Sequence, residues 1–233
     1  MLKSLFQFFR HRLRPPLQTL QSPKPRTQYE SLLEPLTITN SLQTPQFQVS
    51  QLSSATHLYI VTTINMSITI RPETVSDIPS SQSVTTLAFS TLLEANILSG
   101  LRDASALTLS LVATLPNSST VVGHVAFSPV TVPDATNWVG LGPISVHPDY
   151  QRKGVGSKLI VTGIELLKRQ GVNGCVLLGN PDYYKRFGFV NTALRYDGVE
   201  DQKYFMAMVL NGDCPAGSVQ YHSAFDIPPP KEE

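Results

Sequence analysis

The stretch that decides the fold is Gly142-Pro-Ile-Ser-Val-His-Pro-Asp-Tyr-Gln-Arg-Lys-Gly-Val-Gly-Ser-Lys-Leu159. Its apolar first part predicts the end of a buried strand, and an amphipathic helix is predicted to begin at Gly154. The loop between them carries Arg152 and Lys153, and one residue separates Gly154 from Gly156. A helix N-terminus offers unpaired backbone N–H groups and the positive end of the helix dipole. The loop therefore predicts a site for a phosphate or a similar anion.

Glycines between a strand and a helix have more than one explanation. A glycine pair alone also fits an ordinary turn that uses glycine for its backbone geometry. The dinucleotide-binding fingerprint needs a third glycine three residues after the second, and position 159 is leucine. A Walker A loop needs Gly-Lys followed by Ser or Thr, which does not occur here. Both of these nucleotide-binding motifs are excluded.

Composition narrows the class of protein. The chain has 233 residues, of which 41% are hydrophobic and 15% charged, so it is able to form a core and is not disordered throughout. No run approaches eighteen consecutive apolar residues, so we expect no helix that spans a membrane. The two cysteines, Cys175 and Cys214, are too few for a disulfide scaffold or a structural zinc site. We therefore expect no metal and a reducing compartment.

The two ends of the chain differ in charge. Residues 1–65 hold six Lys/Arg and two Asp/Glu, a net charge of +4, whereas residues 66–233 hold twelve and fifteen, a net charge of −3. Three interpretations of the first segment stay open: a mitochondrial transit peptide, an unstructured tail, or a translation start at Met66. The transit-peptide interpretation rests on apolar residues at helical spacing, which are Leu2, Leu5, Phe6, Phe9 and Leu13. We expect a cytoplasmic protein, or a mitochondrial one if the leader is a transit peptide.

The remaining residues predict a mixed α+β fold. Alternating or apolar runs predict strands at 67–71, 107–113, 121–128, 138–146, 175–178 and 204–210. Helical patterns are found at 78–101, 154–170 and 182–187. The first of these helices has as core candidates Leu87, Leu92, Leu93, Ile97, Leu98 and Leu101. Gly140, Gly142 and Pro143 are poor strand residues and predict a bulge or a break in pairing.

Two motifs in the second half carry a family resemblance. The segment Gln151-Arg-Lys-Gly-Val-Gly156, behind Ile144-Ser-Val-His-Pro148, resembles motif A of the GNAT superfamily of acyl-CoA N-acyltransferases. Tyr183-Tyr-Lys-Arg-Phe-Gly-Phe189, behind Val176-Leu-Leu-Gly-Asn180, resembles its motif B. Together with the closing Val219-Gln-Tyr-His-Ser-Ala-Phe225, these stretches are similar to a bacterial-type subgroup of YhbS-like predicted acetyltransferases. The chain departs from the common motif B where Asn180-Pro-Asp replaces Asn-x-x-Ala, which puts the cofactor contact of Asn180 in doubt.

The resemblance covers about residues 67–211 and implies a fold and a cosubstrate. It implies a central, mostly antiparallel twisted sheet that is splayed at the acetyl-CoA site and flanked by helices. We expect an acetyltransferase domain over 66–211 and a C-terminal extension over 212–233. The implied coenzyme A contacts are Ile144, Ser145, Val146, Gln151, Arg152, Lys153, Gly154, Val155, Gly156, Ser157 and Asn180.

The implied reaction is direct attack of a neutral amine on the thioester of acetyl-CoA. The backbone N–H of Val146 would polarise the carbonyl, and Tyr184 would donate a proton to the departing thiolate. No nucleophilic residue is required, so Cys175, in a short apolar strand, is interpreted as core packing. The general base stays open between His124, Glu94, His147 and a chain of waters. His124 is the first candidate because strand alternation could point it into the cleft.

Other functions are weighed on the same residues. The alternative is a non-catalytic acyl-CoA-binding module or sensor, which would keep the loop and lose turnover. Nucleic-acid binding is disfavoured because residues 66–233 are net acidic and carry no basic-aromatic stripe. That acidity mildly suits a cationic amine substrate. We expect acetyl-CoA and a small-molecule or peptide amine as partners; a homodimer stays open.

Overall fold

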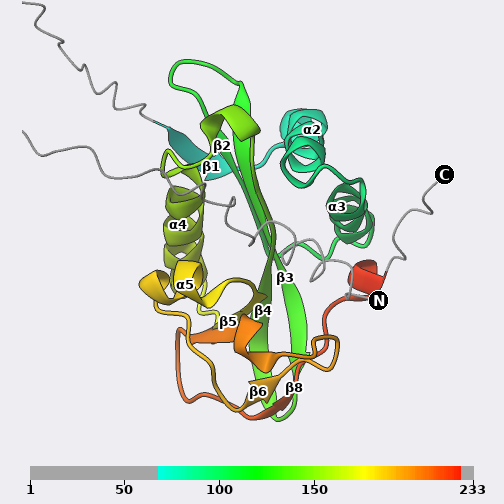
Figure 1. The fold of residues 1–233 in the computed structure, drawn as a ribbon, viewed down its shortest axis with the longest axis vertical. Coiled ribbons are helices and arrows are strands. Elements are labelled where there is room, and N and C mark those ends of the chain that lie inside the picture. Colours follow the sequence, from blue (N-terminus) through cyan, green and yellow to red (C-terminus); the bar gives the residue numbers. More distant parts are fainter. Residues whose placement is uncertain (1–67, 227–233) are drawn as a thin grey trace, which may run out of the picture. The chain divides into compact units, whose positions relative to one another are not determined.

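The central element is a six-stranded sheet (Figure 1). This computed structural model describes residues 68–226, and the structural statements concern those residues. The strands lie side by side in the order β1, β2, β3, β4, β5, β7, and all neighbours are antiparallel except β4 and β5. Their bounds are β1 (Thr69–Pro72), β2 (Leu109–Thr114), β3 (Val121–Val132), β4 (Ala135–Val146), β5 (Gly174–Leu178) and β7 (Phe205–Val209).

Helices cover both faces of this sheet. Figure 1 shows α2 (Ile78–Phe89) and α3 (Leu93–Asp103) on one side and α4 (Val155–Arg169) on the other. The short α5 (Pro181–Tyr184) continues into η3 (Lys185–Phe187). Single 3-10 turns also form η1 (Val75–Asp77), η2 (Pro148–Tyr150), η4 (Gln202–Tyr204) and η5 (Ser223–Asp226). The predicted mixed fold, a mostly antiparallel sheet flanked by helices, is confirmed.

The main core lies between α4 and the sheet. Leu159, Ile160 and Leu167 on α4 are fully buried against β2 and β3. Gly163 faces Phe127, and a Cβ at Gly163 would lie 2.5 Å from that ring. Because glycine has no side chain, α4 packs close to the sheet at this point. This packing fixes the N-terminus of α4 relative to β4.

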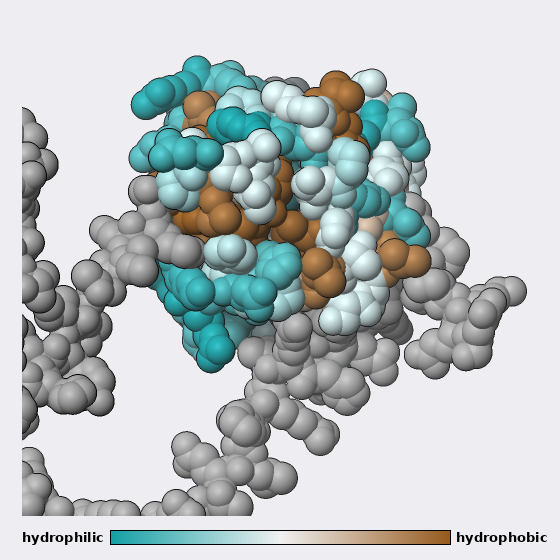
Figure 2. Space-filling view, turned by 90° about the horizontal axis from the view of Figure 1, so that it is seen from above, coloured by the Kyte–Doolittle hydropathy of each residue, from teal (hydrophilic) through white to brown (hydrophobic). Residues whose placement is uncertain are grey.

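The mainly helical stretch predicted over 78–101 is confirmed, and it consists of two helices, α2 and α3. It divides at Ser90, whose φ of 59° is left-handed and whose N–H closes the last turn of α2 on Thr86. The break changes the face that each following residue presents. Leu92, which follows the break, is 54% exposed, and Leu87, which precedes it on α2, is 48% exposed; the other four predicted core candidates are buried. Exposed apolar groups of this kind are normal: on the face shown in Figure 2, hydrophobic residues lie in separate patches among hydrophilic ones.

The bulge predicted near Gly142 is confirmed. Val125 on β3 pairs with Ile144 on β4, and Phe127 pairs with Leu141, so β4 contains one extra residue. On its other edge, β4 pairs with β5 only from Trp138 to Gly140. Beyond that point the two strands diverge. The sheet is therefore splayed beside the C-terminal half of β4, as the family resemblance implies.

The described part of the C-terminal extension packs on the domain. β8 (Gly217–Ser218) pairs with β6 (Leu194–Arg195), and Gln220 forms a bridge with Thr131. Phe225 joins a cluster of buried residues with Leu93 and Ile97 of α3. The leader predicted over 1–65 lies outside the described residues, so its three interpretations and the predicted location stay predictions.

Candidate active site

A cleft of about 720 Å³ lies where β4 and β5 diverge. Its walls come from the end of β4, the loop and first turn of α4, α5 with η3, and the C-terminus of α2. The lining residues are Ala88, Phe89, Ile144, Ser145, Val146, Tyr150, Gln151, Arg152, Gly154, Val155, Gly156, Ser157, Asn180, Tyr183, Tyr184 and Arg186. The structure thus brings together every predicted site residue except His124 and Lys153.

The N-terminus of α4 opens on this cleft, and its first N–H groups have no hydrogen-bond partner in the part of the chain that the structure describes. Gly154 precedes the helix with φ +82°, and no side chain caps the first turn, which also contains no acidic residue. A Cβ at Gly154 would meet no atom within 4 Å, so the glycine leaves the approach clear. The first N–H groups of a helix have no intrahelical acceptor. With the helix dipole they form a site suited to an anion.

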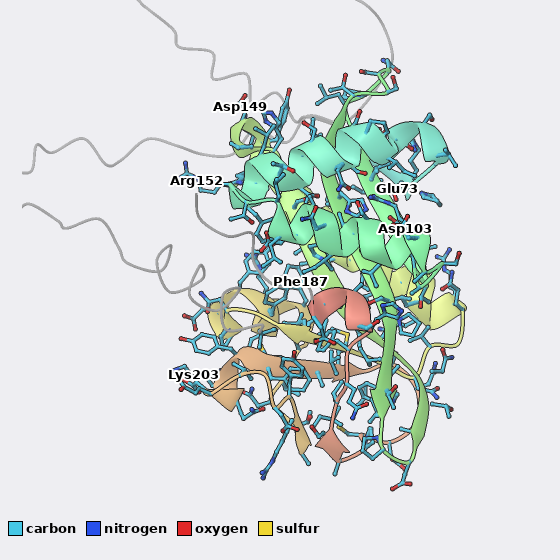
Figure 3. The ribbon with its side chains drawn as sticks, turned by 90° about the vertical axis from the view of Figure 1, so that its right-hand side faces the viewer. Glu73, Asp103, Asp149, Arg152, Phe187 and Lys203 are labelled. Atoms are coloured by element: carbon cyan, nitrogen blue, oxygen red, sulfur yellow. The ribbon has the colours of Figure 1, made fainter. Side chains whose placement is uncertain are left out.

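Two arginines add positive charge at the cleft. Arg152 lines it from the loop, and in Figure 3 this side chain projects outward at the edge of the molecule. Arg186 lines it from η3, with its guanidinium 4.0 Å from the centroid of the Tyr183 ring. Lys153 does not line the cleft; its ammonium lies 5.4 Å from the centroid of Tyr150. Arg152 and Arg186 are therefore the cations placed to meet phosphate groups.

The backbone of β4 presents polar groups to the same space. The N–H of His147 donates to the carbonyl of Val122 at 2.9 Å. Since backbone groups alternate along an antiparallel ladder, the N–H and C=O of Val146 face away from β3. The Val146 carbonyl accepts a hydrogen bond from Gln151 Nε2 at 3.0 Å, which agrees with its facing away from β3. The Val146 N–H therefore points to the side where β5 has left the sheet.

The side chain of Ser145 serves to hold the strand. Its hydroxyl shares a hydrogen bond of 2.9 Å with that of Thr85 on α2, and both residues are buried. The Asn180 side chain is likewise engaged, since its oxygen accepts from the N–H of Asp182 at 2.9 Å and caps α5. These two residues position the walls of the cleft through their side chains.

Tyr184 lies at the inner end of the cleft. Its side chain is 6% exposed and lines the cleft, and its hydroxyl makes no hydrogen bond within the described residues. Gly179 makes room for the ring, because a Cβ there would collide with it. Burial raises the pKa of Tyr184 well above its ordinary value. The hydroxyl is therefore protonated at neutral pH and is able to act as a donor.

His124 lies elsewhere, in a polar cluster that we call the buried clasp (Glu73, Ser81, Arg102, Ser110 and His124). Its ring is fully buried, with Nε2 2.8 Å from the hydroxyl of Ser110 and 3.6 Å from Glu73. Burial lowers the pKa of His124 more than Glu73 raises it. The histidine is not among the residues that line the cleft, so its geometry does not support the predicted role as base. Alternation along β3 points its side chain to the face that α2 and α3 cover.

The other two side chains considered as the general base, His147 and Glu94, lie in different places relative to the cleft. His147 Nδ1 accepts from the N–H of Asp149 at 3.3 Å, so this ring shapes the turn after β4 and lies outside the cleft lining. Glu94 lines a second, smaller cavity of about 70 Å³. That cavity shares Phe89, Ile144 and Tyr184 with the cleft, so the two adjoin. Cys175 is fully buried in the main core, as expected for packing.

Five residues that line the cleft were not among the predicted site residues, namely Ala88, Phe89, Tyr150, Tyr183 and Arg186. Arg186 stands in the stretch that resembles motif B, and its charge near a phosphate site was the available signal. Phe89 reaches the cleft because α2 ends there, which helical periodicity over 78–101 does not indicate. Tyr150 stands in the loop before Gln151, where aromatic residues carry no motif.

Comparisons with known proteins identify the family of the chain. The profile of the Acetyltransferase (GNAT) family matches residues 83–189. An uncharacterized N-acetyltransferase, YhbS of Escherichia coli strain K12, is 36% identical over 166 residues, which span 67% of this chain and 98% of that protein. The chain belongs to the GNAT acetyltransferase family.

Solved structures of this family resemble the fold. A GNAT family acetyltransferase from Brucella melitensis, in complex with acetyl-CoA, is 42% identical with a TM-score of 0.60, over 68% of this chain and 98% of that one. YhbS from Escherichia coli, in complex with CoA, is 33% identical with a TM-score of 0.66, over 70% and 93%. These relatives are bound to acetyl-CoA or CoA, so the predicted cosubstrate class is supported.

Two further findings concern the described part of the chain. Between residues 68 and 226, no helix has the length and hydrophobicity needed to span a bilayer. Over the same residues, no group of three or more His, Cys, Asp or Glu side chains is arranged to hold a metal ion.

Proposed function

We propose that this protein is an N-acetyltransferase that transfers the acetyl group of acetyl-CoA to an amine by direct attack. The observation that carries the proposal is the uncapped N-terminus of α4 beside the free polar edge of β4, within one cleft. Phosphate groups fit the N-terminus of α4, and an extended chain with amide groups fits the edge of β4. The family of the chain and the complexes of its relatives support acetyl-CoA as the occupant.

The residues of the cleft then have separate tasks. The N–H groups at the start of α4, with Arg152 and Arg186, bind the diphosphate. The edge of β4 from Ile144 to Val146 pairs with the pantetheine arm. The N–H of Val146 stabilises negative charge on the thioester oxygen as the amine attacks, because a fixed donor is already in place.

Tyr184 is assigned as the acid that protonates the departing thiolate. A thiol has a pKa of about 8.5, so the thiolate leaves without much assistance and the acid adds a modest acceleration. We therefore expect Tyr184→Phe to lower kcat about tenfold and to leave the affinity for acetyl-CoA unchanged. Tyr204→Phe is the matched control, because Tyr204 lines neither cavity.

The experiment measures release of free thiol from acetyl-CoA over a panel of amines, with calorimetry of acetyl-CoA binding. Binding together with amine-dependent thiol release supports the proposal. Binding without turnover on any amine supports the non-catalytic module instead. Absence of binding removes the assignment of the cleft altogether.

A further inference from the structure

The smaller cavity beside the cleft has polar groups that the fold does not pair. It holds about 70 Å³, roughly the volume of two water molecules, and lies at the bulge of β4. Aromatic rings form much of its wall, and one carboxylate faces it. Its lining includes Glu94 from α3, Phe89 from α2, Tyr221 and Phe225 from the C-terminal segment, and Tyr184 from α5; the remaining lining residues are Ile97, Leu141, Gly142, Pro143, Ile144 and Leu178.

Glu94 is a buried carboxylate that forms no ion pair with any residue between 68 and 226. The residue is 3% exposed, and its single hydrogen bond within the described residues comes from the hydroxyl of Thr91, at 2.6 Å. The elements packed against α3 are α2, β4 and η5. Neither α2 nor β4 contains a charged residue, and η5 contains the exposed Asp226. His222, just before η5, is engaged by the N–H of Ala224.

This arrangement is unfavourable unless something compensates for the charge. A buried carboxylate loses hydration, and proteins normally supply a cation or several hydrogen-bond donors in its place. Among the described residues, the lining of the cavity includes no lysine, arginine or histidine. The missing positive charge is therefore expected to come from a ligand.

Tyr221 contributes a second unpaired polar group. Its hydroxyl is buried and has no hydrogen-bond partner within the described residues, which is rare in folded proteins. Burial raises the pKa of Tyr221 far above its ordinary value, so the side chain is neutral. Its ring packs with Phe225, the two centroids 5.1 Å apart, and both rings line the cavity. Aromatic faces attract cations, which adds to the preference set by Glu94.

We propose that this cavity receives the ammonium group of the acceptor, a primary alkylamine that is cationic in solution, and that Glu94 binds it and removes its first proton. The inference rests on the proposed function, because the cavity adjoins the cleft at Phe89, Ile144 and Tyr184. A volume of two water molecules accommodates an aminomethyl head. A branched or secondary amine needs more room.

The reaction balances in protons and electron pairs. One proton passes from the alkylammonium to Glu94, which leaves a neutral amine. The nitrogen lone pair forms the C–N bond to the thioester carbon, and the C–S bond breaks with its electron pair on sulfur. The thiolate takes a proton from the Tyr184 hydroxyl, and the second nitrogen proton restores that hydroxyl. Glu94 returns its proton to water, so the products are an N-alkylacetamide, a free thiol and one proton.

The test compares two acceptors of nearly equal shape. Ethylamine is cationic at neutral pH, whereas methoxyamine is uncharged and has no ammonium to bind or deprotonate. We expect Glu94→Gln to lower kcat/KM about a hundredfold for ethylamine and less than about threefold for methoxyamine. The control is Glu165→Gln on the exposed side of α4, which leaves both values unchanged. Equal losses for both amines, or no loss for ethylamine, overturn the proposal.

The pH dependence of kcat/KM is a second test, because it would not change if Glu94 had only a structural role. With Glu94→Gln, kcat/KM for ethylamine rises about tenfold per pH unit from about pH 6 to 9, because the variant depends on the amine already neutral in solution. The wild type should depend on pH less steeply than the variant, because it also accepts the cationic form of the amine. An unchanged profile contradicts the assignment of Glu94.

A binding measurement keeps the inference separate from the proposed function. Saturation-transfer NMR detects ethylamine on the CoA-saturated protein, whether or not turnover occurs. A signal in the wild type that Glu94→Gln abolishes supports the acceptor site, and absence of the signal in the wild type overturns it. If calorimetry shows that CoA itself does not bind, the proposed function fails, and the same ethylamine measurement on the free protein still decides the role of Glu94.

Discussion

The Glu73 carboxylate of the buried clasp and the backbone N–H groups of the cleft differ in their hydrogen bonding, although Arg102 Nε and His124 Nδ1 of the clasp also lack a partner among the described residues. In the clasp, the carboxylate of Glu73 accepts hydrogen bonds from Ser81, Ser110 and Arg102 at 2.5 to 2.8 Å. In the cleft, the first N–H groups of α4 and the N–H of Val146 have no such partner among the described residues. Figure 3 shows Glu73 beside α2 and α3, far from Arg152 at the cleft. Polar groups that are satisfied internally stabilise a fold, whereas those left open are available to a ligand.

The largest expected effect comes from breaking the clasp. Glu73 and Arg102 form an ion pair of 2.8 Å whose side chains are 6% and 13% exposed. Glu73→Ala leaves the guanidinium buried without its partner, so we expect the free energy of unfolding to fall by about 3–5 kcal/mol. Urea denaturation measures this loss.

The comparison requires that CoA binding survives this change. At a temperature where the variant is folded, calorimetry should give the wild-type Kd for CoA, because the clasp does not line the cleft. Glu165→Ala on the exposed side of α4 is the control, with a change within about 0.5 kcal/mol. A clasp variant that is fully stable yet fails to bind CoA would show that the two regions are not separate.

A smaller effect is expected from alanine substitutions at two glycines, which distinguish the cost of backbone strain from obstruction of the ligand. Gly154 and Gly171 stand at the two ends of α4 with φ of +82° and +74°, and a Cβ at either position would meet no atom within 4 Å. Alanine at either site imposes a left-handed residue, which costs about 1–2 kcal/mol of stability. Of the two positions, only Gly154 lines the cleft.

We therefore expect equal losses of stability but unequal effects on binding. Gly154→Ala should weaken CoA binding about tenfold in calorimetry, because its methyl group obstructs the backbone that meets the diphosphate. Gly171→Ala should leave the Kd unchanged. Thermal unfolding of both variants gives the cost of strain for comparison. Equal affinities in the two variants would mean that the diphosphate does not approach the backbone at Gly154.

The same contrast explains what the sequence was able to predict. The Gly154–Gly156 loop and the bulge at Gly142-Pro143 are local features, and both occur where they were expected. His124 also stands in a strand beside β4, and its chemistry alone did not distinguish a base from a clasp residue. That distinction depends on which face α2 and α3 cover, and on partners such as Glu73, 51 positions away in the numbering. The break at Ser90 was equally hidden, because a helical pattern does not record a single left-handed residue.

The smallest expected effect concerns the pH dependence of stability. Burial lowers the pKa of His124 below its ordinary value of about 6.5, so the unfolded chain binds a proton that the folded protein does not. Glu73 acts in the same direction at lower pH: burial alone would raise its pKa, but the His124 ring and the hydroxyls of Ser81 and Ser110 lower it to about 2. In both cases the unfolded state binds more protons, so stability falls as pH falls.

Between about pH 7 and pH 5.5 the histidine dominates this loss, because Glu73 is ionised in both states there. We expect the free energy of unfolding to decrease by about 1 kcal/mol over that interval. His124→Gln should remove most of the slope, since glutamine does not titrate, while lowering stability at neutral pH. Urea denaturation at the two pH values measures the difference. A slope that persists in the variant would place the titrating group outside the clasp. If the affinity for CoA followed the same titration, the clasp and the cleft would be energetically coupled.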